Sequence, residues 1–468
     1  MRTSVDILLT HGYFLVEDEH EKRIMKPYAP LGILYISAYL KSKNFSVDVY
    51  DTTFRSKAEF REYVDHQRPA AIGIYTNLMT KLNVLEMIRF CKSKNCIVIV
   101  GGPEPAYYAE HFLRYGADVV VIGEGEQTLE SLLPALNTYG VHRLHEVQGI
   151  VFLDESGGIV ETNPRPFLAD IDQLPFPDRD AIDMAKYVNT WKSHHGRGSV
   201  SVITARGCPY TCKWCSHGVF GFTHRRRSPA NVVDEIEMII SKHHPEMLWI
   251  ADDVFTINHR WLQSFAAEMN RRNLKIPFEC ITRADRLDNE VLTTLANLGC
   301  FRIWYGSESG SQKILDAMSR GVSVEEIQKM CHLAQRHGIE VGLFVMLGYE
   351  GETIRDIEET IAHLKKTNAD VFLTTVAYPI RGTAYQKSID ADIVTEIPWE
   401  RRTERELKIK GRYSDRFYWY AQRRITNEVR FHQLLHQGSS SILRMAGAYA
   451  KANLARLGMQ LTKHRDSL

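Results

Sequence analysis

Short apolar runs alternate with longer amphipathic stretches over the first 140 residues of the chain. The runs are rich in β-branched residues: VDILLT (5–10), SVDVYD (46–51), AAIGIYT (70–76), CIVIVGG (96–102) and DVVVIG (118–123). Helical patterns lie between them, for example at 30–44 and 81–95. Continuous apolar runs are typical of parallel strands that helices cover on both faces. The pattern therefore predicts a doubly wound α/β domain, flavodoxin-like or Rossmann-like, over residues 1–140.

Glycine and glutamate follow the predicted strands of this domain. In a doubly wound sheet, ligands bind beyond the carboxyl ends of the strands, and glycine allows close approach of a ligand or a positive φ there. Ordinary turn chemistry is the alternative explanation. The candidate ligand-binding residues at this edge are Gly101, Gly102, Gly123, Glu124, Gly125 and Glu126.

The regular alternation stops between residues 141 and 195. Two apolar runs flank Glu155-Ser-Gly-Gly158, which is a hairpin signal, and the next segment is rich in Pro and Asp. We expect a connector with one hairpin.

A second alternating series fills residues 196–390. Six apolar runs, at 199–205, 246–253, 277–285, 301–309, 340–351 and 370–383, are separated by helical stretches. One of these helices has clear start signals, with Ser228 as the N-cap and Pro229 at the first helical position. Six such units favour a partial (β/α)6 barrel of TIM type, in which chemistry gathers at the carboxyl ends of the strands.

The C-terminal region, residues 391–468, is predicted to be helical and basic. Residues 401–468 contain 15 Lys and Arg against 5 Asp and Glu. A basic amphipathic helix can lie on anionic lipid, whereas packing over the barrel with a solvated charged face is the commoner arrangement. Both alternatives remain open at this level.

Composition sets limits on the whole chain. The 468 residues are 44% hydrophobic and carry a net charge of +1, which argues against general nucleic-acid binding. No segment has the roughly 18 consecutive apolar residues of a membrane span, and the N-terminus does not read as a signal peptide. Eight cysteines are too few for a disulfide scaffold. We therefore expect a cytoplasmic globular protein.

Three of the eight cysteines lie together in RGCPYTCKWCSH, as Cys208, Cys212 and Cys215. A structural zinc site uses four protein ligands, usually two cysteine pairs, so this spacing is a poor zinc pattern. Iron–sulfur clusters are also bound by thiolates, normally four. Three thiolates on a 4Fe-4S cluster would leave one iron open for a ligand, at the mouth of the predicted barrel.

At these residues the sequence resembles the radical S-adenosylmethionine (radical SAM) enzymes, whose C-x3-C-x2-C signature has an aromatic residue where Trp214 stands. The resemblance implies that the open iron binds S-adenosylmethionine and that cluster reduction yields a 5′-deoxyadenosyl radical. It also implies roles for further residues. Asp252 and Asp253 would face the methionine ammonium, Ser307 and Glu308 would lie near the ribose, and Gly348 near adenine. Tyr349 and Glu350 depart from the family's usual Pro-Gly.

Residues 1–140 resemble the cobalamin-binding domain that many radical SAM enzymes carry, on PYAPLGILYISAYL, IVIVGGPEP and ADVVVIGEGEQTLESLL. The D-x-H-x-x-G motif that supplies a cobalt-ligating histidine is absent, as in many members of this fused class. The lower axial ligand of cobalt is therefore undefined. His11 and His20 are predicted to be surface residues.

The resemblance predicts a cobalamin-dependent radical SAM enzyme that methylates an unactivated carbon or phosphorus centre of a small-molecule or lipid-like substrate. A radical oxidative cyclase with the same cofactors is the alternative enzyme, and a non-catalytic cobalamin or iron–sulfur sensor is the alternative of another class. We expect an external electron donor of flavodoxin or ferredoxin type, no nucleic-acid partner, and peripheral membrane contact if the basic tail binds lipid. The sequence assigns no catalytic residue.

Overall fold

The computed structural model describes residues 5–436 and 441–463. The chain divides into two compact units. The first consists of the residues up to Pro209, with Ser216–Ala251 and Ile397–Thr403; the second consists of Tyr210–Cys215, Asp252–Glu396 and the residues from Glu404 onward. Each unit is described below by itself.

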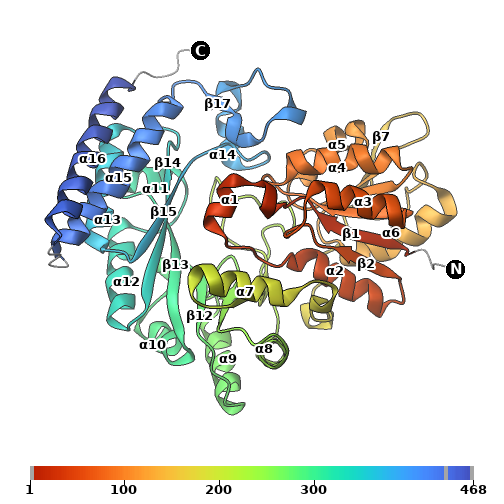
Figure 1. The fold of residues 1–468 in the computed structure, drawn as a ribbon, viewed down its shortest axis with the longest axis horizontal. Helices are drawn as coiled ribbons and strands as arrows, with labels where there is room; N and C mark the ends of the chain where they lie inside the picture. The colour runs from red at the N-terminus through yellow and green to blue at the C-terminus, as the bar shows by residue number, and fades with distance from the viewer. Residues whose placement is uncertain (1–4, 437–440, 464–468) are drawn as a thin grey trace. The chain divides into compact units, whose positions relative to one another are not determined.

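The first unit contains the predicted doubly wound sheet (Figure 1). Its parallel strands are β1 (Ile7–His11), β2 (Val47–Tyr50), β3 (Ala71–Tyr75), β4 (Ile97–Gly101) and β5 (Val119–Val121). Their order is β2-β1-β3-β4-β5, so the chain reverses direction across the sheet next to β1. The predicted hairpin forms β6 (Ile150–Leu153) and β7 (Ile159–Glu161), which add to the β5 edge in antiparallel fashion. The connector thus extends this sheet.

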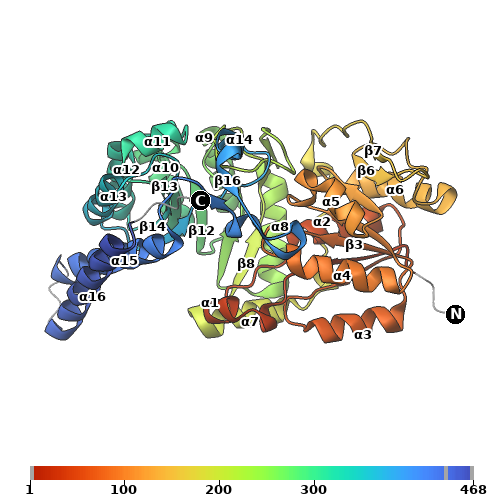
Figure 2. The same cartoon turned by 90° about the horizontal axis from the view of Figure 1, so that it is seen from above.

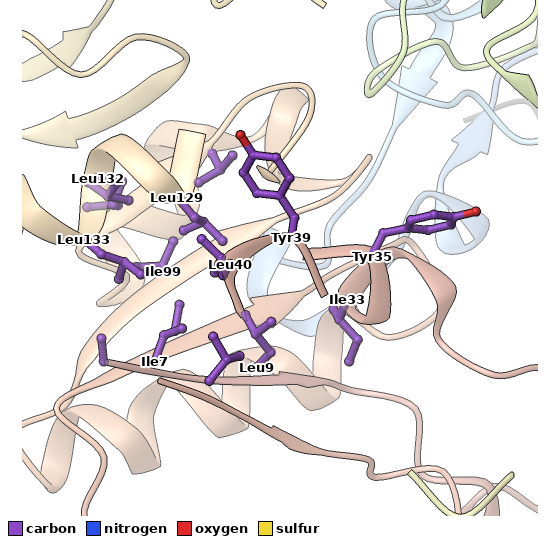
Figure 3. Packing of buried hydrophobic residues seen from close by; sticks show 14 of the residues in the cluster. Ile7, Leu9, Ile33, Tyr35, Tyr39, Leu40, Ile99, Leu129, Leu132 and Leu133 are labelled. Carbon is purple, nitrogen blue, oxygen red and sulfur yellow. The ribbon is translucent and has the colours of Figure 1, made fainter. Parts of the chain in front are cut away.

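Helices cover both faces of this sheet. Successive residues of β1 point to opposite faces, so they pack against different helices. Ile7 and Leu9 pack with α2 (Leu31–Ser42) and α6 (Glu126–Tyr139), as Figure 3 shows for Leu40 and Leu132. Leu8 belongs to the cluster on the other side. That cluster is formed with α3 (Lys57–Gln67), α4 (Lys81–Ser93) and α5 (Ala109–Tyr115).

The first unit also holds α1 (Glu19–Ile24), α7 (Met184–His195), β8 (Ser199–Val202), β9 (Ala205–Arg206), β10 (Arg225–Arg226), α8 (Pro229–His243) and β11 (Met247–Ile250). β8 and β11 pair in parallel, and β9 and β10 form a short antiparallel ladder. α8 begins as predicted, because the Ser228 side chain accepts a hydrogen bond from the Asn231 N–H and Pro229 occupies the first turn. The sequence analysis did not identify α7, β9 or β10.

The second unit continues the β/α alternation. Its parallel strands are β12 (Phe278–Thr282), β13 (Cys300–Glu308), β14 (Glu340–Leu347) and β15 (Val371–Val376), paired in that order. Helices α9 (His259–Arg271), α10 (Asn289–Leu298), α11 (Gln312–Ala317), α12 (Val324–Arg336) and α13 (Ile354–Thr367) lie between and before them in the chain. Together with β8 and β11, these are the six strands of the predicted partial barrel.

Two long helices end the described chain. They follow α14 (Ala384–Ser388), β16 (Ile393–Val394) and β17 (Lys408–Ile409). α15 (Asp415–His436) and α16 (Ile442–Leu461) lie side by side (Figures 1 and 2). α16 approaches α15 through small buried residues such as Ala448, Ala452 and Gly458; a Cβ at Gly458 would collide with the Tyr420 ring. Among the described helices, none has the length and apolarity needed to cross a bilayer.

Candidate functional site

The cysteine loop begins just after β9, which follows β8, the first strand of the second series. All three cysteines are outside disulfides, with Cys212 buried and Cys208 and Cys215 partly exposed. The loop turns tightly at its centre, where the Cys215 N–H donates to the Cys212 carbonyl over 3.1 Å. The thiols are therefore available as ligands.

Two buried arginines reach the sulfur of Cys212. Arg320 Nη1 lies 3.3 Å and Arg283 Nη1 lies 3.7 Å from Cys212 Sγ. Arg283 follows β12, and Arg320 follows α11, which comes after β13. Two buried positive charges therefore lie beside this sulfur. Arg320 was not among the predicted site residues, because no local pattern distinguishes it.

Ser307 and Glu308 lie at the end of β13 and are buried. Ser307 Oγ is 2.9 Å from His363 Nε2, and the other ring nitrogen of His363 is 3.2 Å from Gln328 Nε2. Burial raises the pKa of Glu308, although Arg320 and Arg283 partly offset this effect. Glu308 Oε1 is 4.0 Å from Arg320 Nη2. Arg320 thus lies beside both the predicted ribose-binding carboxylate and one of the three predicted cluster thiols.

Asp252 and Asp253 follow β11 and differ in exposure. Asp252 is 2% exposed, whereas Asp253 points to the surface. The two carboxylates therefore do not present one matched face. Of the pair, Asp252 is the better candidate for a role inside the site.

Gly348 and Glu352 close a tight turn after β14. Gly348 has a φ of +73°, and a Cβ there would come within 2.6 Å of Arg412 Nη2, so this position requires glycine. Its N–H donates to Glu352 Oε2 over 2.6 Å. Burial raises the pKa of Glu352 to about 8. The turn is therefore held by a carboxyl group that is largely protonated at neutral pH.

Tyr349, one departure from the family pattern, stacks on Tyr385 with ring centroids 4.5 Å apart. The Tyr385 N–H in turn donates to the carbonyl of Lys213, within the cysteine loop, over 2.8 Å. Trp214 packs against the same apolar cluster. The substitution for proline is thus accommodated by an aromatic stack that contacts the cysteine loop.

At the edge of the first sheet, Gly102 and Gly123 have positive φ angles, +112° and +82°, as predicted for turns after strands. A Cβ at Gly102 would collide with the Thr76 carbonyl. Gly101 has only ordinary contacts at its Cβ position, and Gly125 packs against Ile36. The structure thus gives a steric reason for glycine at Gly102 in particular.

Glu124 and Glu126 are engaged by arginines. Arg206 Nη1 lies 2.7 Å from Glu124 Oε1 and Arg206 Nη2 lies 2.5 Å from Glu126 Oε1. Arg225 Nη1 contacts Glu124 Oε2 at 2.9 Å. Arg206 and Arg225 pair across β9 and β10, which flank the cysteine loop in the sequence. These acids therefore hold the base of that loop, a role that the sequence analysis did not predict.

The prediction that His11 lies on the surface is wrong. As the last residue of β1, His11 is 3% exposed and its Nε2 is 2.9 Å from Asp51 Oδ1. The Tyr13 N–H donates to its Nδ1 over 3.2 Å. His20 has an exposed side chain, as predicted. Because both nitrogens of His11 are occupied by protein groups, this histidine is a poor candidate for a cobalt ligand.

Comparison with known families gives two matches in one chain. Residues 202–364 match the radical SAM superfamily, and residues 24–133 match the B12 binding domain. The chain belongs to the cobalamin-binding radical SAM enzymes. The matches cover the cysteine loop and the edge of the first sheet described above.

Two curated relatives and one solved structure illustrate this family. An uncharacterized methyltransferase of Pyrococcus horikoshii is 26% identical over 388 residues, 80% of this chain and 81% of the relative. The anaerobic magnesium-protoporphyrin IX monomethyl ester cyclase of Rubrivivax gelatinosus is 26% identical over 74% of this chain and 63% of its own length. The radical SAM methyltransferase TsrM from Kitasatospora setae, solved with cobalamin and a [4Fe-4S] cluster, has a TM-score of 0.69 at 18% identity, over 86% of this chain and 80% of its own. That likeness confirms the fold.

The cofactors of this family are a 4Fe-4S cluster, S-adenosylmethionine and cobalamin. The chemistry of the donor set fits the cluster, because three cysteines outside disulfides lie in one loop and two guanidinium groups contact Cys212. Within residues 5–436 and 441–463, no three His, Cys, Asp or Glu side chains converge as ligands of a single metal ion. A cluster does not need such convergence, because its thiolates bind separate irons.

Proposed function

We propose that this radical SAM enzyme transfers a methyl group to an unactivated carbon or phosphorus centre of a small-molecule or lipid-like substrate. The observation that carries the proposal is the presence, in one chain, of a cysteine triad whose Cys212 contacts two arginines and of a B12-binding domain. When bound, the cluster supplies the electron that cleaves S-adenosylmethionine and cobalamin supplies a methyl carrier. A methyltransferase among the relatives supports this assignment.

The residues of the chain have distinct proposed roles. Cys208, Cys212 and Cys215 hold the cluster. Glu308 and Asp252, both buried near barrel strand ends, contribute to the site of S-adenosylmethionine, with Ser307 held by His363. The turn at Gly348 bounds the adenine. Asp253, being exposed, contributes less, and the cobalamin edge is formed by Gly101, Gly102, Gly123 and Gly125.

The direct test uses protein reconstituted without oxygen, with dithionite as reductant and S-adenosylmethionine carrying a deuterated methyl group. A metabolite and lipid extract of the source organism provides candidate substrates. We expect release of 5′-deoxyadenosine and a product that has gained one deuterated methyl group. The Cys212→Ala variant serves as the control and should give neither signal.

The cyclase relative provides a specific second candidate function, radical oxidation or ring closure with the same cofactors. The mass of the product separates the two. A gain of one methylene unit means methylation, whereas loss of hydrogen or gain of oxygen means oxidation or cyclisation. A fully loaded protein that releases no 5′-deoxyadenosine with any extract would favour a sensor over both enzymes.

We also propose that the protein works in the cytoplasm with an external electron donor of flavodoxin or ferredoxin type, and that α16 contacts anionic membrane. The contact is argued from the outer face of α16, where Leu443, Leu454, Leu457 and Leu461 are 87%, 66%, 55% and 77% exposed. Spacings of 11, 3 and 4 residues place these leucines on one side of a helix. The 20 residues of α16 include Arg444, Lys451 and Arg456 but no acidic residue.

The basic charge of α16 favours an anionic bilayer over a second copy of the helix as the surface that covers these leucines. Each basic residue near an anionic bilayer contributes about 1 kcal/mol, and exposed leucines bury apolar area among the lipids. Two copies of α16 pairing through the same face would bring like charges together, which disfavours self-association.

Co-sedimentation with vesicles tests the membrane contact. We expect binding to phosphatidylglycerol vesicles at low salt, much weaker binding to phosphatidylcholine vesicles, and loss of binding in a Leu454→Ser, Leu457→Ser double variant. Leu82→Ser, a change at an exposed leucine of α4, is the matched control and should bind as the parent does. Equal sedimentation of all variants would refute the contact, and a concentration-dependent dimer would assign the face to a second copy.

A further inference from the structure

The side chains of Arg283 and Arg320 bring two positive charges to one ligand of the cluster. Their Nη1 atoms lie 3.7 and 3.3 Å from Cys212 Sγ, and the two residues are 4% and 8% exposed. Charges buried to this extent are poorly screened by water, so their effect on a neighbouring sulfur is far stronger than at the surface. The contact is therefore electrostatically significant as well as geometrically close.

Both guanidinium groups are fixed by other contacts. Arg283 donates to the two oxygens of Asp285 at 2.8 and 3.3 Å, and its Nη2 donates to the Arg320 carbonyl over 2.7 Å. It also lies over the ring of Tyr210, within the cysteine loop, 3.9 Å from the centroid. Arg320 Nη2 donates to the Gly306 carbonyl over 2.7 Å. The two groups are thus held in place by protein contacts in addition to the sulfur.

The charge of Arg320 is only partly balanced. The carboxylate oxygen Glu308 Oε1 lies 4.0 Å from its Nη2, beyond hydrogen-bond distance, and burial raises the pKa of Glu308. Its buried Nε has no hydrogen-bond partner among the described residues. An N–H donor in this state is suited to an anionic acceptor, such as a sulfide of the cluster.

We propose that Arg320 and Arg283 are positioning residues that hold Cys212 and raise the reduction potential of the cluster. In the reduction step, one electron passes from the external donor, which is oxidised, to the cluster, which gains one negative charge without a proton. Hydrogen bonds to sulfur and nearby positive charge stabilise the reduced state more than the oxidised state. The arginines therefore make the cluster easier to reduce.

The test is an EPR-monitored redox titration of reconstituted protein without S-adenosylmethionine, so that no turnover enters the measurement. Arg320→Gln and Arg283→Gln should each shift the midpoint potential to more negative values. Arg320→Lys keeps the positive charge but loses the planar guanidinium with its several N–H donors, and it should shift the midpoint potential less. Arg286→Gln removes a charge that lies 5.5 Å from the Tyr210 ring and is 40% exposed at its side chain, and it should leave the potential close to that of the parent.

Iron and sulfide content and the melting temperature of the apoprotein accompany each titration. A Gln variant that folds like the parent but takes up less cluster supports the holding role. If Arg320→Gln does not fold, the midpoint potential of the cluster in Arg320→Lys is compared with that of the parent instead. Full clusters with the parent's midpoint potential in both Gln variants would overturn the proposal.

Discussion

The two units contain buried charged clusters of different design. In the first unit, Arg206 and Arg225 meet Glu124 and Glu126 at distances of 2.5–2.9 Å, two cations against two anions. In the second unit, Arg283 is paired with Asp285, but Arg320 faces a thiol at 3.3 Å and a carboxylate only at 4.0 Å. In the first cluster each arginine lies within 3 Å of a carboxylate oxygen, whereas in the second Arg320 reaches the Glu308 carboxylate only at 4.0 Å.

The pKa shifts follow this difference. Burial opposes ionisation in both clusters, but in the first Arg206 and Arg225 lower the pKa of Glu124, and Glu126 and Glu124 raise that of Arg206. In the second, burial prevails and the pKa of Glu308 is raised. A balanced cluster stabilises the fold, and an unbalanced one is suited to bind a cofactor.

The largest expected effect separates binding from folding. Cys212→Ser should abolish cluster uptake, because serine is not a thiolate ligand, while leaving the protection of the first unit against hydrogen exchange unchanged. Iron and sulfide analysis after reconstitution, with hydrogen exchange of the apoprotein, provides the measurement. Cys96→Ala, a change at a buried cysteine just before β4, should retain full iron content; loss of iron in this variant would show that the assay reports general damage.

The next effect concerns the balanced cluster. Arg206→Met leaves the buried carboxylate of Glu126 without this partner and should destabilise the first unit by about 3–5 kcal/mol, the usual cost of removing one partner from a buried ion pair. Hydrogen exchange of β5 and α6 measures it. The exposed pair Arg143–Glu155 provides the control, and Arg143→Met should cause no measurable change. Equal destabilisation by Arg206→Met and Arg143→Met would contradict the distinction between buried and exposed ion pairs.

Local patterns were sufficient to predict the strands. All five parallel strands of the first sheet and the six of the barrel series appear at the predicted runs, because each run carries its own periodicity, and α15 and α16 lie within the region predicted to be helical. The cysteine triad could also be recognised from the sequence, since its three residues lie within one short loop. The burial of His11 could not be predicted, because it depends on Asp51, which is 40 residues away.

The charged clusters could not be predicted from the sequence, because their partners are distant along the chain. Arg206 and Glu126 are 80 residues apart, and Arg320 and Cys212 are 108 apart. An isolated arginine in a turn gives no periodic signal and resembles any solvated basic residue. Glu124 and Glu126 were predicted to be cofactor-binding residues from their place after a strand, a prediction that stays open, and their arginine partners could only be found in three dimensions.

The comparison also predicts opposite responses to pH. The pKa of Glu352 is raised from 4.5 to about 8 by burial, so its carboxyl is neutral in the folded second unit and ionised in the unfolded chain between these values. The stability that it contributes is present below about pH 4.5 and is lost as pH rises through 8, by roughly 3–5 kcal/mol. Glu352→Gln, which can still accept from Gly348, should remove this pH dependence. Exchange rates of β14, corrected for intrinsic exchange, give the measurement; an unchanged slope in the variant would place the titration elsewhere.

His363 should make the stability of the second unit depend on pH in the opposite direction, and by a smaller amount. Burial lowers its pKa from 6.5 to about 4, so the folded second unit holds it neutral while the unfolded chain binds a proton in this range. The stability that it contributes is present above pH 6.5 and falls by roughly 2–3 kcal/mol as pH drops to 4. His363→Gln should flatten this acid limb in the exchange of β13 and α13, and Ser307, which loses a ring partner at 2.9 Å, should become less protected at all pH values. Glu124, whose pKa is lowered, stays ionised over most of the same range, so β5 and α6 should show little of this slope. If β5 and α6 show the same loss of protection at low pH, the second unit does not titrate independently of the first. The contrast between the paired charges of the first unit and the charges beside Cys212 in the second would then lose its physical basis.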